Sequence, residues 1–325
     1  MMVTSEPITH EYFREDRLNM FWRFICERQM IWYKRSIQKL DPPWTEDHIM
    51  QRERFTNIYR ELDPGTKYAI QHILEIDAPK PDKIFNIMFY RLTGRDKSHA
   101  AVGFQYLATF DPERLEQALK HIRDVKGEPV FTAAYMVGAY TRMGSTDKIE
   151  NVVRLFTKLD QDFTDFYARI EACQSSAEVY EVLRSPYGFG NFLAYQVLVD
   201  LLYPLKMYGN KPLLPYSHDD WSIPGPGARR GIAMLLKNDA HAERLDVMRW
   251  LRHNQRAEFQ RLGLNFPFVT DEQGKQIDIS LANIQNCLCE FHKYVKIGDG
   301  TGRGRRKFTS STLGDVLQLS LTLPS

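Results

Sequence analysis

Cysteine is scarce in this chain of 325 residues, and long apolar runs are absent. The four cysteines are Cys26, Cys173, Cys287 and Cys289. They do not form the closely spaced framework of a small disulfide-bonded secreted protein, so we expect a reducing, cytoplasmic location. No apolar run approaches the roughly 20 residues that cross a bilayer, and the polar N-terminus has no signal-peptide pattern. We therefore expect no membrane partner.

An excess of charge of one sign is missing too. The chain has 43 basic and 41 acidic residues, a formal net charge of +2. This balance argues against a strongly basic DNA-coating protein, but it is compatible with a local phosphate-binding groove. Apolar residues make up 43% of the chain and aromatic residues 12%, as in a well-packed globular protein.

Strictly alternating, strand-like runs are rare, whereas apolar residues recur at three- and four-residue spacing. Helices are predicted at 11–40, 46–62, 66–77, 81–93, 112–125, 131–143, 146–159, 161–173 and 176–184. Two short runs within residues 266–279 predict one small β-hairpin. We expect an all-α fold in one compact domain, 1–325, of two lobes at about 1–175 and 176–325.

The most informative stretch begins with a predicted amphipathic helix. Phe24 and Ile31 repeat at helical spacing, which places Arg28, Trp32 and Arg35 together on one face. Tyr33 and Glu27 accompany them. Surface helices rarely mix aromatic residues, arginines and carboxylates this densely.

A second predicted helix follows a proline-rich break. Thr45 has the character of an N-cap for this helix. Glu53, Asn57, Arg60 and Glu61 would then share one stripe. A polar functional cleft and a salt-bridged structural pair of helices both explain this pattern, and the residue types alone leave the two open.

Residues 27–35, 42–45, 55–66, 225–231 and 286–294 resemble one family. It is the α-glutamyl/putrescinyl thymine pyrophosphorylase family of phage thymine hypermodification. Its members include amino acid:DNA transferases and the helical domain found beside 5-hydroxymethyluracil DNA kinases. The resemblance implies a phage origin, host cytoplasm as the location, and a helical fold related to DNA glycosylases.

A possible helix-hairpin-helix motif lies further along the chain. A helix ending near Arg184 is followed by a turn containing Gly188, Gly190 and Asn191, and then by an apolar helix over 192–202. Such a turn can hold a DNA phosphate on its backbone amides, although short glycine turns also connect ordinary packed helices. In the glycosylase superfamily a catalytic aspartate follows the hairpin. Here Asp220 follows after a longer spacing.

Two further stretches have the character of anion sites. Arg229 and Arg230 follow Gly225-Pro226-Gly227 at a helix start, which suits phosphate or pyrophosphate, or else forms a rigid loop with surface arginines. The basic residues of a glycine-rich C-terminal segment suit DNA phosphates, or else form an exposed charged loop. They are Arg303, Arg305 and Arg306.

Cys287, Cys289 and His292 lack a fourth ligand at zinc spacing, so we expect no zinc site.

The resemblance implies a substrate that is already activated, namely thymine in DNA whose 5-methyl carbon carries phosphate or pyrophosphate. An amine such as glycine, glutamate or putrescine would displace that group from a flipped base. The catalytic candidates are Glu27, Arg28, Arg35, Asn57, Arg60, Glu61, Asp63 and Asp220. Among them arginines would stabilise the leaving polyanion, together with Arg229 and Arg230, and a carboxylate would keep the amine neutral. Trp32, Tyr33 and Tyr59 are candidates for stacking on the base.

The expected partners are double-stranded DNA bearing modified thymine, an amino acid or polyamine donor, and a functionally linked 5-hydroxymethyluracil DNA kinase. No cofactor is required, although Mg²⁺ bound by Asp63, Asp219 or Asp220 would assist pyrophosphate departure. A Walker-type glycine-lysine loop is missing, so the chain is not expected to be the kinase itself. A DNA glycosylase and a non-catalytic DNA-binding module are the alternatives.

Overall fold

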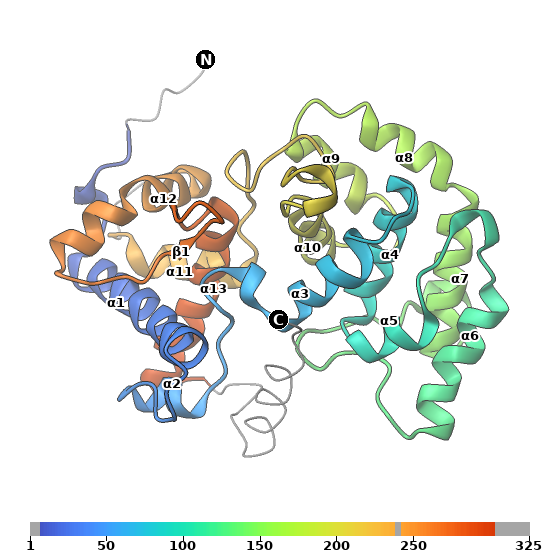
Figure 1. Ribbon diagram of the computed structural model, residues 1–325, viewed down its shortest axis with the longest axis horizontal. Coiled ribbons are helices and arrows are strands. Elements are labelled where there is room, and N and C mark those ends of the chain that lie inside the picture. The colour runs from blue at the N-terminus through green and yellow to red at the C-terminus, as the bar shows by residue number, and fades with distance from the viewer. Residues whose placement is uncertain (1–6, 238–241, 303–325) are drawn as a thin grey trace. The chain divides into compact units, whose positions relative to one another are not determined.

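A computed structural model describes residues 7–237 and 242–302 of the chain. Regular structure in these ranges is helical apart from one antiparallel pair of strands, β1 (Val269–Thr270) and β2 (Gln276–Ile277) (Figure 1). The all-α fold class is therefore confirmed, and so is the small hairpin expected within residues 266–279. No helix among the described residues is long and apolar enough to span a bilayer.

The chain divides into two compact units. Unit 1 combines Met1–Arg60 with Pro224–Ser325, and unit 2 is the continuous stretch Glu61–Ile223. The lobes expected from the sequence had a boundary near residue 175 instead. The division differs because α1 (Glu15–Trp32) packs against α11 (Pro226–Leu235) and α13 (Leu281–Gly298), which lie more than 190 positions further along the chain.

Unit 1 is held together by aromatic side chains of its long helices. Its remaining elements are the 3-10 turn His10–Tyr12, the π-helical turn Tyr33–Ile37, α2 (His48–Arg52) and α12 (Arg244–Arg261). The ring of Phe21 on α1 lies 5.3 Å from that of Phe291 on α13, and Trp22 lies 5.1 Å from Phe259 on α12. The helical periodicity of α1 is thus explained by burial of its apolar face.

Two glycines on α11 allow an unusually close approach to α13. A Cβ atom at Gly231 would collide with the carbonyl group of Leu288, and one at Gly227 would collide with the thiol of Cys289. Only glycine leaves this space free, so the two helix backbones can come together. The glycines of residues 225–231 therefore have a packing role that the sequence interpretation, an anion-binding loop, did not include.

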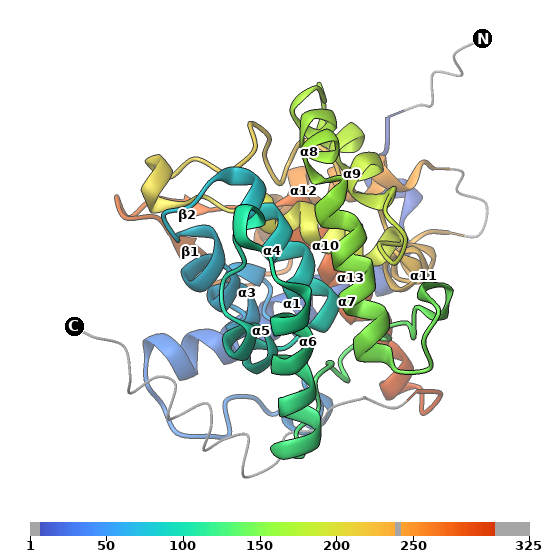
Figure 2. The ribbon, with the colours of Figure 1, turned by 90° about the vertical axis from the view of Figure 1, so that its right-hand side faces the viewer.

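Unit 2 consists of helices around a second aromatic core. Its α-helices are α3 (Pro64–Ala69), α4 (Lys80–Thr93), α5 (Asp96–Val102), α6 (Pro112–Lys120), α7 (Lys148–Gln161), α8 (Phe163–Glu171), α9 (Ser176–Arg184) and α10 (Asn191–Leu201). The 3-10 turn Arg60–Leu62 begins at the last residue of the first segment of unit 1. Further short 3-10 or π-helical turns of unit 2 lie at Ile70–Leu74, Leu107–Thr109, His121–Val125, Thr141–Met143 and Lys206–Tyr208. Helices α6 and α7 lie side by side (Figures 1 and 2). The ring centroids of Phe85 and Phe89 of α4 each lie 5.3 Å from that of Phe156 of α7.

A buried ion pair joins α4 to α10 inside unit 2. The guanidinium group of Arg91 donates to both carboxylate oxygens of Asp200. Asp200 is completely buried, and Arg91 is 9% exposed. A pair of this kind is stable only because each charge has its partner, since either group alone would lose its hydration without compensation.

The helix predicted over 46–62 is wrong. Only α2 forms there, and the chain continues without regular structure through residues 54–59. The N-cap of α2 is Asp47, whose carboxylate accepts hydrogen bonds from the amides of Ile49 and Met50; the prediction that Thr45 caps the helix is therefore also wrong. Backbone carbonyl groups after α2 are bound by side chains of other helices rather than by the next turn, as described below.

The helix predicted over 131–143 is wrong as well. This stretch is irregular until the 3-10 turn at Thr141–Met143. Its carbonyl groups accept hydrogen bonds from α7: Lys148 Nζ donates to Val137 at 2.9 Å, and Asn151 Nδ2 donates to Ala139 at 2.9 Å. Tertiary hydrogen bonds here replace the helical ones that the apolar spacing suggested.

Candidate functional site

The centre of the candidate site is the pairing of Arg28 with a loop of unit 1. From α1, Arg28 donates through Nη2 to Oδ1 of Asn57 at 2.8 Å. Its Nε and Nη2 atoms also donate to the carbonyl oxygen of Phe55, at 3.4 and 3.3 Å. Arg28 is 8% exposed and Asn57 3%. A buried guanidinium group thus fixes both the backbone and a side chain of the 54–60 segment.

Helix α13 holds the same 54–60 segment through polar side chains. Lys293 donates through Nζ to the carbonyl group of Arg54 and lies 4.3 Å from the ring centroid of Phe55. Asn286 Nδ2 donates to Oγ1 of Thr56 at 2.7 Å. The backbone amide of Arg60 donates to Oδ1 of Asn283 at 3.2 Å. The sequence-distant blocks 55–66 and 286–294 therefore meet within unit 1, at residues 55–60.

Arg60, at the end of this segment, is a buried cation. Its side chain is 8% exposed, and its buried Nε atom has no hydrogen-bond partner among the described residues. A buried guanidinium N–H without an acceptor costs free energy, so such an atom is a candidate for binding a ligand. Arg60 lies within electrostatic range of the Cys289 thiol, as does Arg230 of α11.

The start of α11 adjoins the same thiol. Gly225 is its N-cap and supplies no side-chain cap, and Pro226 occupies the first turn. Gly227, in that turn, lies directly against Cys289. The first amides of a helix carry partial positive charge and lack intrahelical acceptors, so this end favours an anion. Arg229 is turned back onto the loop instead, with Nε donating to the carbonyl oxygen of Pro224 at 2.9 Å.

Three cations, Lys293, Arg60 and Arg230, and one carboxylate, Glu290, act on the Cys289 thiol. Burial and the neighbouring Glu290 raise the pKa of the Cys289 thiol to about 11, while the charges of Arg60 and Arg230 act in the opposite direction. The pKa of His292 is lowered by burial and then by repulsion from Arg230 and Lys296. We call Arg60, Arg230, Cys289 and His292 the Cys289 cluster. Its chemistry suits the binding of a multiply charged anion.

Glu27, a candidate base, has a structural partner. It accepts a hydrogen bond from Oγ1 of Thr45, and the same hydroxyl oxygen accepts from the amide of Asp47 at 3.0 Å. Tyr294 of α13 donates to Asp47 Oδ2 at 2.6 Å. This chain of hydrogen bonds links α1, the start of α2 and α13, and it accounts for Glu27 without assigning it a catalytic function.

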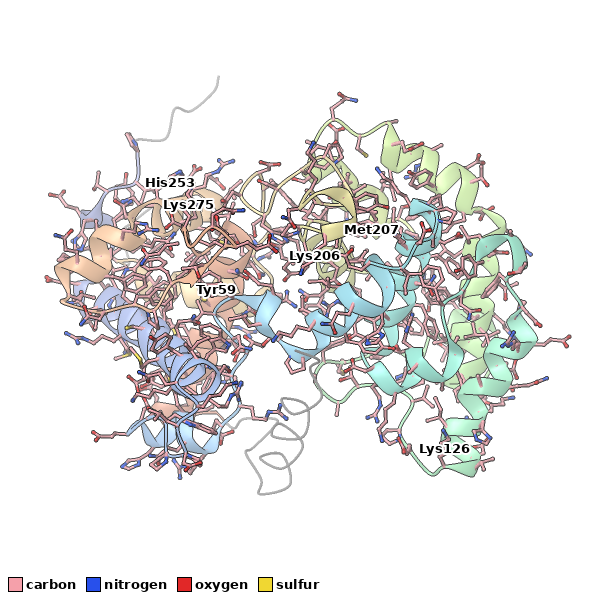
Figure 3. The ribbon with its side chains drawn as sticks, in the orientation of Figure 1. Tyr59, Lys126, Lys206, Met207, His253 and Lys275 are labelled. Atoms are coloured by element: carbon pink, nitrogen blue, oxygen red, sulfur yellow. The ribbon has the colours of Figure 1, made fainter. Side chains whose placement is uncertain are left out.

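The aromatic candidates have different environments. Trp32, Tyr33 and Arg35 are half-buried, and the Arg35 guanidinium group lies 5.8 Å from the ring centroid of Trp44. Tyr59, labelled in Figure 3, belongs to the 54–60 segment. It is completely buried, and its hydroxyl group donates to the carbonyl oxygen of Ile277 at 2.6 Å. Its ring is part of the core of unit 1, so the expected stacking of Tyr59 on a base does not fit this structure.

The remaining described candidates belong to unit 2. Both carboxylate oxygens of Asp220 accept from Ser217, at 2.8 Å from its amide and at 2.8 Å from its hydroxyl group, so Asp220 closes a turn. Glu61 and Asp63 precede α3 and are half-buried. Arg303, Arg305 and Arg306 lie outside the described residues.

The predicted hairpin turn connects α9 to α10, and these two helices pack together. Gly188 has φ of +92°, and a Cβ atom there would approach Leu155 to 2.6 Å. Gly190 is the N-cap of α10, and Asn191 is its first residue. Two helices joined by a short glycine-containing turn are present, as expected. Phosphate binding by this turn remains a prediction.

Comparison with known proteins decides the family. The family model described as "5-hmdU DNA kinase, helical domain" matches residues 15–302. The chain belongs to this family. A protein of Bacillus phage SP10 named 5-hmdU DNA kinase is 32% identical to it over 289 residues, covering 85% of this chain and 44% of that protein. The chain therefore spans less than half the length of this relative. No solved structure matches.

Membership of the helical-domain family confirms the link to 5-hydroxymethyluracil DNA kinases that the resemblance implied. The likeness to DNA glycosylases and the transferase activity stay predictions.

Sequence reasoning missed the polar residues of α13 that position the site. Asn283, Asn286, Lys293 and Tyr294 each bond residues 45–60 or their neighbours. Their spacing of three, seven and one residues places most of them on one helical face, a signal that was available within the 286–294 block. From the sequence, this block was assigned to the family resemblance and was rejected as a zinc site, and its asparagine and lysine side chains were given no role. Among the described residues, no group of His, Cys, Asp or Glu side chains is arranged to hold a metal ion.

Proposed function

We propose that this helical-domain protein is a DNA-modifying transferase of thymine hypermodification. In the proposed reaction an amine, such as that of glycine, displaces the phosphate or pyrophosphate of 5-(pyro)phosphomethyl-deoxyuridine in DNA. The amine nitrogen forms a bond to the 5-methylene carbon, and the C–O bond breaks. The leaving group departs with the bonding electron pair, and the nitrogen gives its proton to a carboxylate.

The observation that carries the proposal is the buried Arg60 guanidinium group, with its unsatisfied Nε atom, in the Cys289 cluster. Arg230 and the uncapped start of α11 adjoin the same thiol. A departing polyanion would satisfy these donors, and preorganised donors of this kind stabilise charge that develops in a transition state. Family membership supports the choice of modified thymine as the substrate.

The assignments of the other residues follow from their partners. Arg28 and Asn57 fix the segment that ends in Arg60, so we assign them a positioning role. Glu27 accepts a hydrogen bond from Thr45, and Asp220 accepts from Ser217. The proposed base is one carboxylate of the set Glu27, Glu61, Asp63 and Asp220. Trp32 and Tyr33, both half-buried, remain the proposed stacking residues. No cofactor enters the reaction, and EDTA tests whether Mg²⁺ assists it.

The test is mass spectrometry of nucleosides. Duplex DNA containing 5-phosphomethyl- or 5-pyrophosphomethyl-deoxyuridine is incubated with the protein and a panel of amino acids and polyamines. A new nucleoside carrying the donor, with released phosphate or pyrophosphate, is expected. Arg60→Gln should lower turnover about 100-fold. The matched control is Arg52→Gln, because Arg52 is an exposed arginine of unit 1 whose Nε donates only locally, to His48.

A second candidate is a non-catalytic DNA-binding module that serves a kinase. It is favoured by the similarity to a 5-hmdU DNA kinase more than twice as long as the matched region. Unchanged nucleosides with intact glycosidic bonds would support this candidate against the transferase. In that case Arg60→Gln would weaken DNA binding only. Free base and abasic DNA would support a glycosylase instead.

A further inference from the structure

An exposed aromatic surface of unit 2 has no role in the proposed reaction. It is formed by the irregular segment before α7 and by the turn between α9 and α10. Helices α9 and α10 lie side by side (Figure 1). Met136 is 90% exposed, Phe192 48% and Tyr187 38%. The ring of Tyr135 lies 5.1 Å from that of Phe192. We call Tyr135, Met136, Tyr187 and Phe192 the aromatic face.

The aromatic face is supported by fixed contacts from beneath. Tyr135 donates through its hydroxyl group to the carbonyl oxygen of Arg91 at 2.5 Å. The carbonyl group of Val137 accepts from Lys148 at 2.9 Å, and the Tyr140 ring lies 6.2 Å from that of Tyr187. Apolar side chains that are held at the surface contribute no free energy of burial to the fold. A ligand that covers them removes them from water, and this burial would favour its binding.

Positive charge borders the aromatic face. Arg142 is exposed, lies 5.6 Å from the ring centroid of Tyr187, and forms no ion pair among the described residues. Gly190 gives the start of α10 no side-chain cap, and the exposed Phe192 is the second residue of that helix. Arg184 contributes less, because its guanidinium group is bound by Glu181. Helix amides and an unpaired arginine beside flat rings are complementary to a phosphate backbone with bases.

We infer that the aromatic face is a DNA surface that opens the stack of base pairs. Arg142 and the first amides of α10 hold the backbone, while Met136 and Phe192 insert beside a base step and partly unstack it. The inference rests on the proposed function in taking DNA as the substrate. It extends that function by naming residues outside the Cys289 cluster that prepare the duplex for base extrusion. We take DNA as the occupant because the exposed Arg142 and the open first amides of α10 are complementary to a phosphate backbone.

The experiment uses the full chain and unmodified duplex DNA without any amine donor. Affinity is measured by fluorescence anisotropy, and unstacking by the fluorescence of 2-aminopurine placed in the duplex. Met136→Glu and Phe192→Ala should each weaken binding about 10-fold and abolish the fluorescence increase. Arg142→Gln should reduce the slope of log affinity against log salt by about one. The control is Val125→Ala, at an apolar residue of unit 2 that is 71% exposed.

Unchanged affinity and unchanged 2-aminopurine fluorescence in Met136→Glu would overturn the inference, since a side chain 90% exposed is not needed for folding. Loss of binding to a kinase with DNA binding intact would also overturn it and identify a protein-docking surface. The two proposals fail separately. If the protein transfers no amine but the variants of the aromatic face still bind DNA more weakly, the proposed reaction is wrong and the DNA surface is supported.

Discussion

Arg28 and Asn57 are joined by a 2.8 Å hydrogen bond between two side chains that are both more than nine-tenths buried. The two residues lie 29 positions apart, and the bond fixes the loop that carries Arg60. Two of the polar residues singled out in the first 66 residues are therefore in direct contact. They join a helix to a loop, whereas the sequence predicted two helices.

Replacing Asn57 by alanine removes an acceptor from a buried cation. We expect the free energy of unfolding to fall by about 1–3 kcal/mol, and turnover to fall while DNA affinity is kept. Denaturant unfolding and nucleoside mass spectrometry measure the two effects. The control is Asn19→Ala, because Asn19 accepts from the exposed Arg261, which keeps Glu258 as a partner. Equal effects of the two substitutions would contradict the prediction.

Replacing Gly231 by alanine should force α11 away from α13. The added methyl group would meet the Leu288 carbonyl group, a backbone atom that cannot rotate aside. We expect a loss of about 1–3 kcal/mol or more in the free energy of unfolding. In Gly225→Ala the nearest atom would be Gln285 Nε2 at 3.9 Å, so this control should cost less. A Gly231 variant as stable as the control would show that the helices can separate freely.

Replacing Asp200 by asparagine leaves the Arg91 charge buried without its counterion. We expect about 3–5 kcal/mol of destabilisation, read from thermal or denaturant unfolding. The double variant Arg91→Met with Asp200→Leu removes both charges together and should recover much of the loss. Failure of the double variant to recover would indicate that the pair's shape, rather than its charge balance, is required.

His99 should make stability depend on pH in the acidic range. Burial and the neighbouring His72 lower its pKa to about 4, against about 6.5 in an unfolded chain. Between pH 6.5 and 4 the unfolded state takes up a proton that the folded state does not, so stability falls as the pH falls. The loss is at most about 3 kcal/mol.

The test compares unfolding midpoints at pH 7 and pH 5. His99→Gln, which keeps a hydrogen-bonding side chain near Tyr68, should flatten the difference. His253→Gln, at an exposed histidine, should leave it unchanged. A steeper pH dependence in His99→Gln would reverse the sign we assign.

Cys289 should resist alkylation. With a thiol pKa of about 11, only about one molecule in a thousand carries the reactive thiolate at pH 8. We expect iodoacetamide to label Cys289 far more slowly in the folded protein than in urea, as measured by peptide mass spectrometry. Rapid labelling of the folded protein at pH 8 would mean that the thiol is neither buried nor shielded by Glu290.

Much of the helical architecture follows from apolar periodicity alone. The stretch 176–184 was predicted to the residue, because Ser175 caps it and its apolar side chains recur regularly. The failures at 46–62 and 131–143 share a cause. Side chains of α7 and α13 (Lys148, Asn151 and Lys293) bind main-chain carbonyl groups there, and bonds from side chains of another helix leave no periodic signal in the stretch itself.

The sequence predicted several residues of the candidate site, but it did not predict which of them contact one another. Arg28, Asn57 and Arg60 were named from their residue types, and Arg28 and Asn57 meet in the structure. Glu27 and Tyr59 were named on the same grounds, yet their partners are Thr45 and Ile277. Residue type indicates which side chains can do chemistry, whereas the hydrogen-bond partner decides which of them remain available.

The two-segment construction of unit 1 has a consequence for synthesis on the ribosome. The rings of Phe21 and Phe291 touch in the structure but are 270 positions apart in the chain. At about 5–20 residues per second, α1 would wait roughly 15–55 s for this partner. Unit 2, a continuous stretch between the two segments, has all of its residues translated well before then. We therefore expect the aromatic side of α1 to stay uncovered in the nascent protein for longer than the core of unit 2.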